Sequence, residues 1–193
     1  PQHELEPTKL KRRKGTGAAT LDGTPVELFA NIELPEDTEQ ARAVGAQGVG
    51  LFRTEYLFMN RKELPSEDEQ YEAYREVAKT MGTRPVVIRT LDIGADKALD
   101  GNGTVMPNPA LGLRAIRYCL AEPQLFLMQL RAILRASAHG RVRILLPMLA
   151  HAHEIDQSLM LLAQAKQQLD ERRVAYNATV QVEYDLITEG TVP

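Results

Sequence analysis

Two arginines each follow a short apolar run, and each is followed closely by a carboxylate. Arg53 ends an apolar run that begins at residue 48, and it precedes Glu55 by two positions. Arg89 ends a run of valines and isoleucine, and it precedes Asp92 by three positions. A planar guanidinium can donate two parallel hydrogen bonds to one carboxylate or phosphate. Two such groups that meet at one place would therefore suit a small anion that carries several charges.

Two neighbouring strands could deliver both arginines to the same place. Apolar runs alternate with stretches of helical pattern along the chain, which predicts parallel strands joined by helical crossovers. Proteins of this class bind their ligands at the carboxyl ends of the strands. Because side chains alternate along a strand, we expect Arg53 to share one side with Val49 and Leu51, and Arg89 to share one side with Val87. Both arginines should then point inward at the end of an apolar row.

The order of the expected elements indicates the fold class. Strands are predicted at 26–32, 48–53, 86–89, 141–149 and 178–182. Helices are predicted at 34–45, 66–82, 111–138 and 154–173. Ser66 and Glu69 form the cap of the second helix, and Pro123 breaks the third into two pieces. An eight-stranded barrel needs roughly 250 residues. We therefore predict an α/β fold that forms an incomplete (β/α)8 TIM-type barrel of about the first five strands, with an open doubly wound sheet as the alternative.

Composition and charge limit the classes of function. The 193 residues carry a net charge of -3, which gives no overall attraction to nucleic acid or to an anionic membrane. No apolar run approaches the roughly 20 residues of a membrane span. The single cysteine, Cys119, excludes an internal disulfide and a multi-cysteine metal site, and it fits a cytoplasmic protein. Residues 1–16 are expected to be a linker or the end of an upstream helix, and residues 17–193 a partial barrel domain.

Four stretches carry a resemblance to a known family. They read GVGLFRTEYLFM at 48–59, VIRTLDIGADK at 87–97, NPALGLRAIR at 108–117 and LRAILRAS at 130–137. In this order they closely resemble enzyme I of the bacterial phosphotransferase system, a phosphoenolpyruvate (PEP)-protein phosphotransferase of the PEP-utilising enzymes. The resemblance covers nearly everything from Leu21 to about Val182. It implies a PEP-binding barrel that passes a phosphoryl group to a histidine of an upstream domain and on to a small phosphocarrier protein, in a cytoplasmic enzyme that is a homodimer when complete.

The resemblance also assigns roles to individual residues. The two phosphate-contacting arginines of the family fall on Arg53 and Arg89. Lys97 and Arg114 are further substrate-binding candidates, but Lys97 could instead be solvated and Arg114 could anchor its loop. Asp92 is expected to orient an arginine. PEP carries a phosphate and a carboxylate on a small frame, which is the kind of anion that two converging arginines suit.

Several parts of the family's machinery are not identifiable in this chain. The family uses Mg²⁺, which needs hard oxygen ligands, but the register of the last strand places Ile187 where the family has a metal-binding glutamate. Cys119 is predicted to lie on a helix and to pack in the core, so it does not match the family's acid-base cysteine. None of the histidines lies in the family's phosphohistidine motif; they are His3, His139, His151 and His153. We assign no metal ligand and no catalytic residue, and we expect the isolated chain to be inactive.

Two other functions remain open on the sequence. A truncated or regulatory binding module would keep the fold without the reaction, and it would be indifferent to the loss of either arginine. A fragment of a pyruvate phosphate dikinase would share the barrel, but it would need a nucleotide-binding domain elsewhere.

Overall fold

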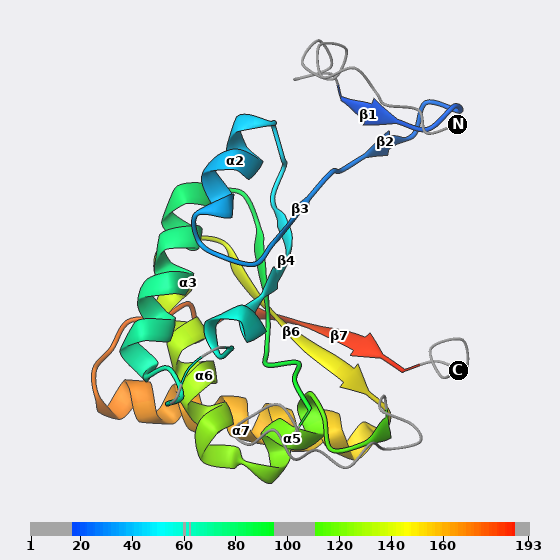
Figure 1. Cartoon of the computed structure of the whole chain (residues 1–193). Coiled ribbons are helices and arrows are strands. Elements are labelled where there is room, and N and C mark those ends of the chain that lie inside the picture. The colour runs from blue at the N-terminus through cyan, green and yellow to red at the C-terminus, as the bar shows by residue number, and fades with distance from the viewer. Residues whose placement is uncertain (1–16, 60, 62, 95–110, 188–193) are drawn as a thin grey trace.

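A five-stranded parallel sheet forms the centre of the protein (Figure 1). The computed structural model describes residues 17–59, 61, 63–94 and 111–187. The strands of the sheet are β3 (Ala30–Ile32), β4 (Val49–Arg53), β5 (Val86–Arg89), β6 (Val142–Leu149) and β7 (Gln181–Leu186). Strands that are adjacent in the sheet are also successive in the chain, and every pairing is parallel.

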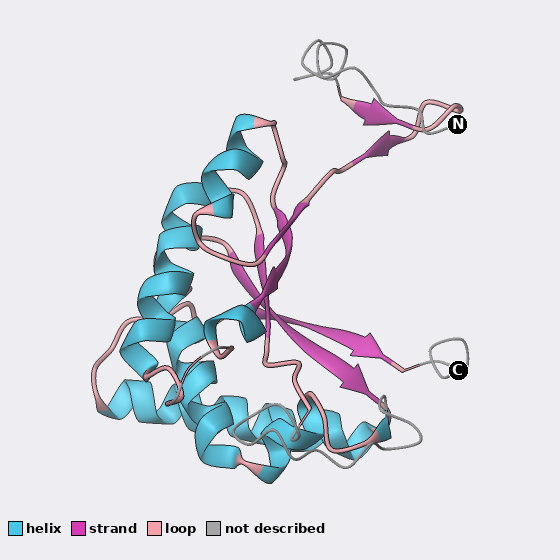
Figure 2. Ribbon diagram, viewed as in Figure 1, coloured by secondary structure: helices cyan, strands magenta, loops and turns pink. Residues whose placement is uncertain are grey.

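The helices gather on one side of this sheet, as Figure 2 shows. They are α2 (Asp37–Ala43), the 3-10 turn η1 (Thr54–Leu57), α3 (Glu67–Met81), α5 (Ile116–Ala121), α6 (Pro123–Ala136) and α7 (Ala152–Glu171). A doubly wound sheet has helices on both faces and a strand order that reverses, so this alternative is wrong. The fold is α/β, an incomplete (β/α) barrel in which β3 and β7 form the two edges of the described sheet. No helix in the described ranges combines the length and apolarity needed to cross a bilayer.

Local sequence signals explain where the long helices begin. The Ser66 hydroxyl accepts a hydrogen bond from the Glu69 amide at 3.2 Å, and the Glu69 carboxylate accepts one from the Ser66 amide at 2.8 Å. This reciprocal capping box was expected at the start of α3. Pro123 separates α5 from α6 and lies in the first turn of α6, where its missing amide hydrogen leaves no helical bond unmade. Both predictions are confirmed.

The core lies between the sheet and the helices. The pairing of β4 with β5 places Val49 on the side of the sheet opposite to the one expected. Val49 pairs with Val86, and Phe52 pairs with Ile88, so the two residues of β4 between these pairs face a single residue of β5. Because of this irregularity, Val49 lies on the helix side together with Phe52, whose ring meets the Tyr74 ring edge-on. The expected alternation that placed Val49 on the side of Arg53 is wrong.

Two predicted strands differ from the observed ones. The expected strand at 26–32 is split into β2 (Pro25–Val26), which pairs with β1 (Ala18–Ala19) in an antiparallel hairpin, and β3, which joins the main sheet. The split arises because Val26 takes Ala18 as its partner. The last strand begins and ends later than the predicted 178–182. Its pairing with β6 starts at Gln181 and continues as far as Leu186.

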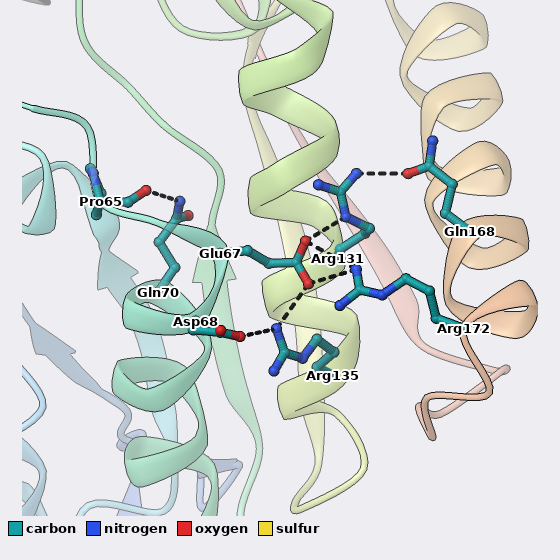
Figure 3. A network of polar contacts seen from close by, with 8 residues as sticks. All are labelled: Pro65, Glu67, Asp68, Gln70, Arg131, Arg135, Gln168 and Arg172. Atoms are coloured by element: carbon teal, nitrogen blue, oxygen red, sulfur yellow. Dashed lines mark hydrogen bonds and ion pairs between the residues drawn. The ribbon is translucent and has the colours of Figure 1, made fainter.

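A partly buried carboxylate joins three helices in the outer layer (Figure 3). Glu67, in the first turn of α3, receives hydrogen bonds from Arg131 at 2.6 Å and from Arg135 at 2.8 Å, both on α6. Arg172, at the end of α7, approaches the same carboxylate at 3.0 Å. Arg135 also contacts the exposed Asp68 at 2.7 Å. We call these five side chains the Glu67 cluster, and it ties α3, α6 and α7 to one another.

Cys119 packs in the core, as expected. Its side chain is fully buried in α5, with its sulfur 3.7 Å from the carbonyl oxygen of Leu91. Burial raises the pKa of the thiol to about 12. The thiol therefore stays protonated near neutral pH and is poorly suited to nucleophilic or acid-base work.

Candidate anion-binding site

Arg53 and Arg89 lie side by side at the ends of neighbouring strands. Each is the last residue of its strand, and the two are register partners in the parallel pairing of β4 with β5. The residues before them, Phe52 and Ile88, are fully buried on the helix side. Successive side chains of a strand point to opposite faces. Both arginines therefore project from the face of the sheet that the helices do not cover.

Two carboxylates hold Arg89. Its guanidinium contacts Glu55 at 2.5 Å and Asp92 at 3.1 Å. The three side chains are only 15%, 12% and 7% exposed, in the order Arg89, Glu55 and Asp92. Ion pairs that are shielded from water keep more of their strength and their geometry than exposed ones. Arg89 is therefore fixed in place before any ligand arrives.

Asp92 also brings a third arginine to this edge of the sheet. Its other oxygen accepts a hydrogen bond from Arg114 Nε at 2.9 Å. The backbone supports this contact, since Gly94 and Arg114 form an antiparallel bridge. Asp92 thus links Arg89 with Arg114, as expected of a residue that orients an arginine. The fourth candidate, Lys97, lies outside the described residues.

Arg53 is held differently and is more accessible. Its guanidinium contacts the carboxylate of Glu33, just past the end of β3, and it lies 5.5 Å from the centre of the Tyr56 ring. Roughly a third of each partner in the ion pair is exposed, at 34% for Arg53 and 37% for Glu33. The Tyr56 hydroxyl bonds to Glu33 as well, and this raises the pKa of the phenol. Arg53 therefore has one exposed carboxylate partner that an incoming anion could displace.

The site thus contains three guanidiniums and three carboxylates. Arg53 pairs with Glu33, Arg89 with Glu55 and Asp92, and Arg114 with Asp92. One guanidinium carries five N–H donors, so these contacts leave donors for a ligand. The arrangement can orient a small anion and place positive charge beside its oxygens.

The structure adds two residues, Glu33 and Gln129, that the sequence does not single out, and it pairs Glu55 with Arg89, although Glu55 follows Arg53 in the sequence. Glu33 pairs with Arg53, and Glu55 pairs with Arg89. Gln129 of α6 accepts a hydrogen bond from the Leu91 amide after β5 and donates one to the Thr54 hydroxyl after β4. Glu55 stood within a recognised motif and could have been chosen for its charge. Glu33 and Gln129 carried no local signal, because their contacts span 20 to 75 positions of the chain.

The described residues do not fit a magnesium site. They contain no group of three or more His, Cys, Asp or Glu side chains that could hold a metal ion. On β7, the carboxylate of Glu183 contacts Arg143 at 2.9 Å. Ile187, at the expected metal-ligand position, only continues the pairing with Leu149 through its amide, at 2.8 Å.

Comparisons with known proteins identify the family of the chain. The sequence profile of the PEP-utilising enzyme, PEP-binding domain, matches residues 7–186. The phosphoenolpyruvate-protein phosphotransferase of Cupriavidus necator is 59% identical over 185 residues, which cover 94% of this chain and 32% of the relative. The proteins of the same name from Staphylococcus epidermidis and Geobacillus stearothermophilus are 43% and 44% identical, with the same 94% and 32% coverage. The chain spans about a third of the length of these relatives. It belongs to the family of PEP-utilising enzymes, within their PEP-binding domain.

Proposed function

We propose that the chain is the amino-terminal part of the PEP-binding domain of an enzyme I-like phosphoenolpyruvate-protein phosphotransferase. Arg53 and Arg89 bind the phosphate of PEP, and Arg114 and Lys97 bind the remainder of the substrate or support its loop. One observation carries the proposal: two neighbouring parallel strands end in arginines that are register partners. The relatives that match the chain are named for this reaction.

Arginines in this position serve phosphoryl transfer in two ways. They hold the phosphate where the acceptor can attack it, and they neutralise charge that spreads over its equatorial oxygens. Arg89 is suited to positioning because Glu55 and Asp92 fix it. Arg53 is suited to charge neutralisation on ligand entry because its partner is exposed. Enzymes of this family generally use Mg²⁺, but the described residues do not fit the ion.

Other parts of the proposal concern the complete protein. Residues 17–193 form the partial barrel domain, and residues 1–16, which lie outside the described residues, connect it to an upstream domain. That domain carries the histidine that accepts the phosphoryl group, and a small phosphocarrier protein receives it next. The complete enzyme is a cytoplasmic homodimer. A dikinase is less well supported, because the relatives given above are named for transfer to a protein.

Isothermal titration of the 193-residue chain with PEP tests this function. The chain should bind PEP, and Arg53→Ala should weaken binding at least tenfold, since a hydrogen bond to a charged group contributes about 1.5–3 kcal/mol. Arg42→Ala is the matched control, because Arg42 is an exposed arginine of α2. Binding that is absent, or equal in Arg53→Ala and the parent chain, would favour an interaction module over the proposed function.

The pairing of Arg53 with Glu33 gives a second prediction. Glu33→Gln should strengthen PEP binding, because a ligand then no longer competes with a carboxylate for the guanidinium. The gain should reach at most about fivefold, since an exposed ion pair contributes roughly 0.2–1 kcal/mol. Titration at low and high salt measures it, and the gain should shrink as salt screens the pair. Weaker binding by Glu33→Gln would show that Glu33 helps to hold Arg53 in its binding position.

A further inference from the structure

Gln129 is a fully buried amide that faces the ends of β4 and β5 from α6. Its oxygen accepts a hydrogen bond from the backbone amide of Leu91 at 2.9 Å. Its nitrogen donates to the hydroxyls of Thr54 at 3.1 Å and Tyr74 at 3.2 Å. The Leu91 amide requires an acceptor, so the orientation of the carboxamide follows from the network. Both hydrogens and the oxygen of the side chain are therefore engaged.

These bonds connect the residue after Arg53, through its side chain, with the backbone at and after Arg89. Thr54 directly follows Arg53, and its hydroxyl donates onward to the carbonyl oxygen of Arg89 at 2.8 Å. Leu91 lies two residues after Arg89. One side chain thus joins the segment after Arg53 to the segment after Arg89, beyond the last register pair of the two strands.

We propose that Gln129 is a positioning residue that sets the relative placement of the Arg53 and Arg89 guanidiniums for PEP. It acts through the Thr54 hydroxyl and the Leu91 amide and does not itself touch the ligand. The inference rests on the proposed function, because placement matters only if both arginines bind one anion. Hydrogen bonds weaken steeply when their distance and angle depart from the optimum, so an amide that fixes two strand ends can influence the affinity of both guanidiniums for one anion.

A second buried glutamine in the same network offers a matched control. Gln70 of α3 is also buried, and its nitrogen donates to the carbonyl oxygen of Pro65 at 3.0 Å, as Figure 3 shows. Its oxygen accepts from the Tyr74 hydroxyl at 3.3 Å. These bonds hold the start of α3 and touch neither strand end. Gln70→Leu therefore removes a buried amide from the network and leaves the contacts of Gln129 to Thr54 and Leu91 in place.

The experiment compares Gln129→Leu with Gln70→Leu in the 193-residue chain. Hydrogen exchange measured by NMR should speed up at least tenfold at the Leu91 amide in Gln129→Leu, after correction for global stability measured in urea. The Nε–H resonances of Arg53 and Arg89 should shift in the same variant. Affinity for PEP, measured by isothermal titration, should fall about tenfold in Gln129→Leu and stay within twofold in Gln70→Leu.

The outcomes separate the positioning role from the proposed function. If the parent chain does not bind PEP, the proposed function fails. The positioning role is then tested by the Nε–H resonances of Arg53 and Arg89 alone: shifts in Gln129→Leu support it, and unchanged resonances overturn it. If the parent chain binds and Gln129→Leu binds equally well, the positioning role is overturned. An equal loss of affinity in Gln70→Leu overturns it as well, because the effect is then a general loss of stability. Should Gln129→Leu not fold, Thr54→Val decides: a tenfold weaker affinity supports the role, and unchanged affinity overturns it.

Discussion

Replacing Arg89 by alanine should abolish measurable PEP binding and destabilise the fold at the same time. Removing one partner of a largely buried, hydrogen-bonded charge pair costs about 2–5 kcal/mol, and the lower bound corresponds to a loss of affinity of about thirtyfold. The stability falls because Glu55, which is 12% exposed, loses the partner it has at 2.5 Å. Asp92 keeps its contact with Arg114. Titration calorimetry and urea unfolding measure the two effects separately.

A double variant separates binding from stability. In Arg89→Ala with Glu55→Gln, the carboxylate that lost its partner becomes neutral, so we expect most of the lost stability to return and no affinity to return. Arg143→Ala is the control on the same face of the sheet, because Arg143 pairs with Val87, two positions before Arg89. Its affinity for PEP should stay within about twofold of the parent chain, as expected of a change away from the site. If the double variant binds PEP like the parent chain, the site is not at these strand ends.

Replacing Glu67 by glutamine should cause the largest loss of stability outside the site. The carboxylate lies among Arg131, Arg135 and Arg172 and is 15% exposed. Without that charge, Arg131 and Arg135, which are 16% and 14% exposed, repel each other with no charged Glu67 between them. Because Glu67 is only partly buried, we expect a loss of up to about 3 kcal/mol, the lower bound for a fully buried pair. Urea unfolding followed by circular dichroism measures the loss. Asp68→Asn is the control: Asp68 is 81% exposed, so its contact with Arg135 should be worth less than about 1 kcal/mol.

The Glu67 cluster also predicts a pH dependence. Burial, the largest single influence, raises the pKa of Glu67, but the combined attraction of Arg131 and Arg172 outweighs it, and the pKa lies below its ordinary 4.5. A group with a lowered pKa in the folded state contributes stability that is complete above the unfolded value and is lost as pH falls through the folded value. The parent chain should therefore lose this stability below about pH 4.5. The difference between it and Glu67→Gln should shrink over the same range; a constant difference would contradict the assignment.

The elements that carry the arginines could be predicted because their signals are local. The capping box at Ser66, the break at Pro123 and the apolar runs that end at Arg53 and Arg89 each depend on a few neighbouring residues. The alternation of the elements that these signals mark predicts a parallel α/β fold, in which successive strands, including the two that carry the arginines, lie next to each other. The strand ends could be located for the same reason.

The details of the site could not be predicted, because distant parts of the chain determine them. The irregular pairing of β4 with β5 depends on two strands at once, so strict alternation misplaced Val49. Glu33 reaches Arg53 across 20 positions, and Gln129 reaches Thr54 across 75. The split of the strand at 26–32 depended on whether Val26 pairs with Ala18 or continues into the main sheet. Each of these contacts depends on which of several distant residues comes into reach in the folded chain, and the local sequence does not contain that information.

The strand order described above has a consequence for synthesis. Because β3, β4, β5, β6 and β7 are adjacent in the order in which they are translated, each strand that leaves the ribosome finds its partner already present. Each pairing closes only the helical crossover between two successive strands, and no strand of the described sheet has to wait for a partner that is translated later. The sheet can therefore grow from its amino-terminal edge while translation continues, and the two arginine-bearing strands can be aligned before β7 has been made.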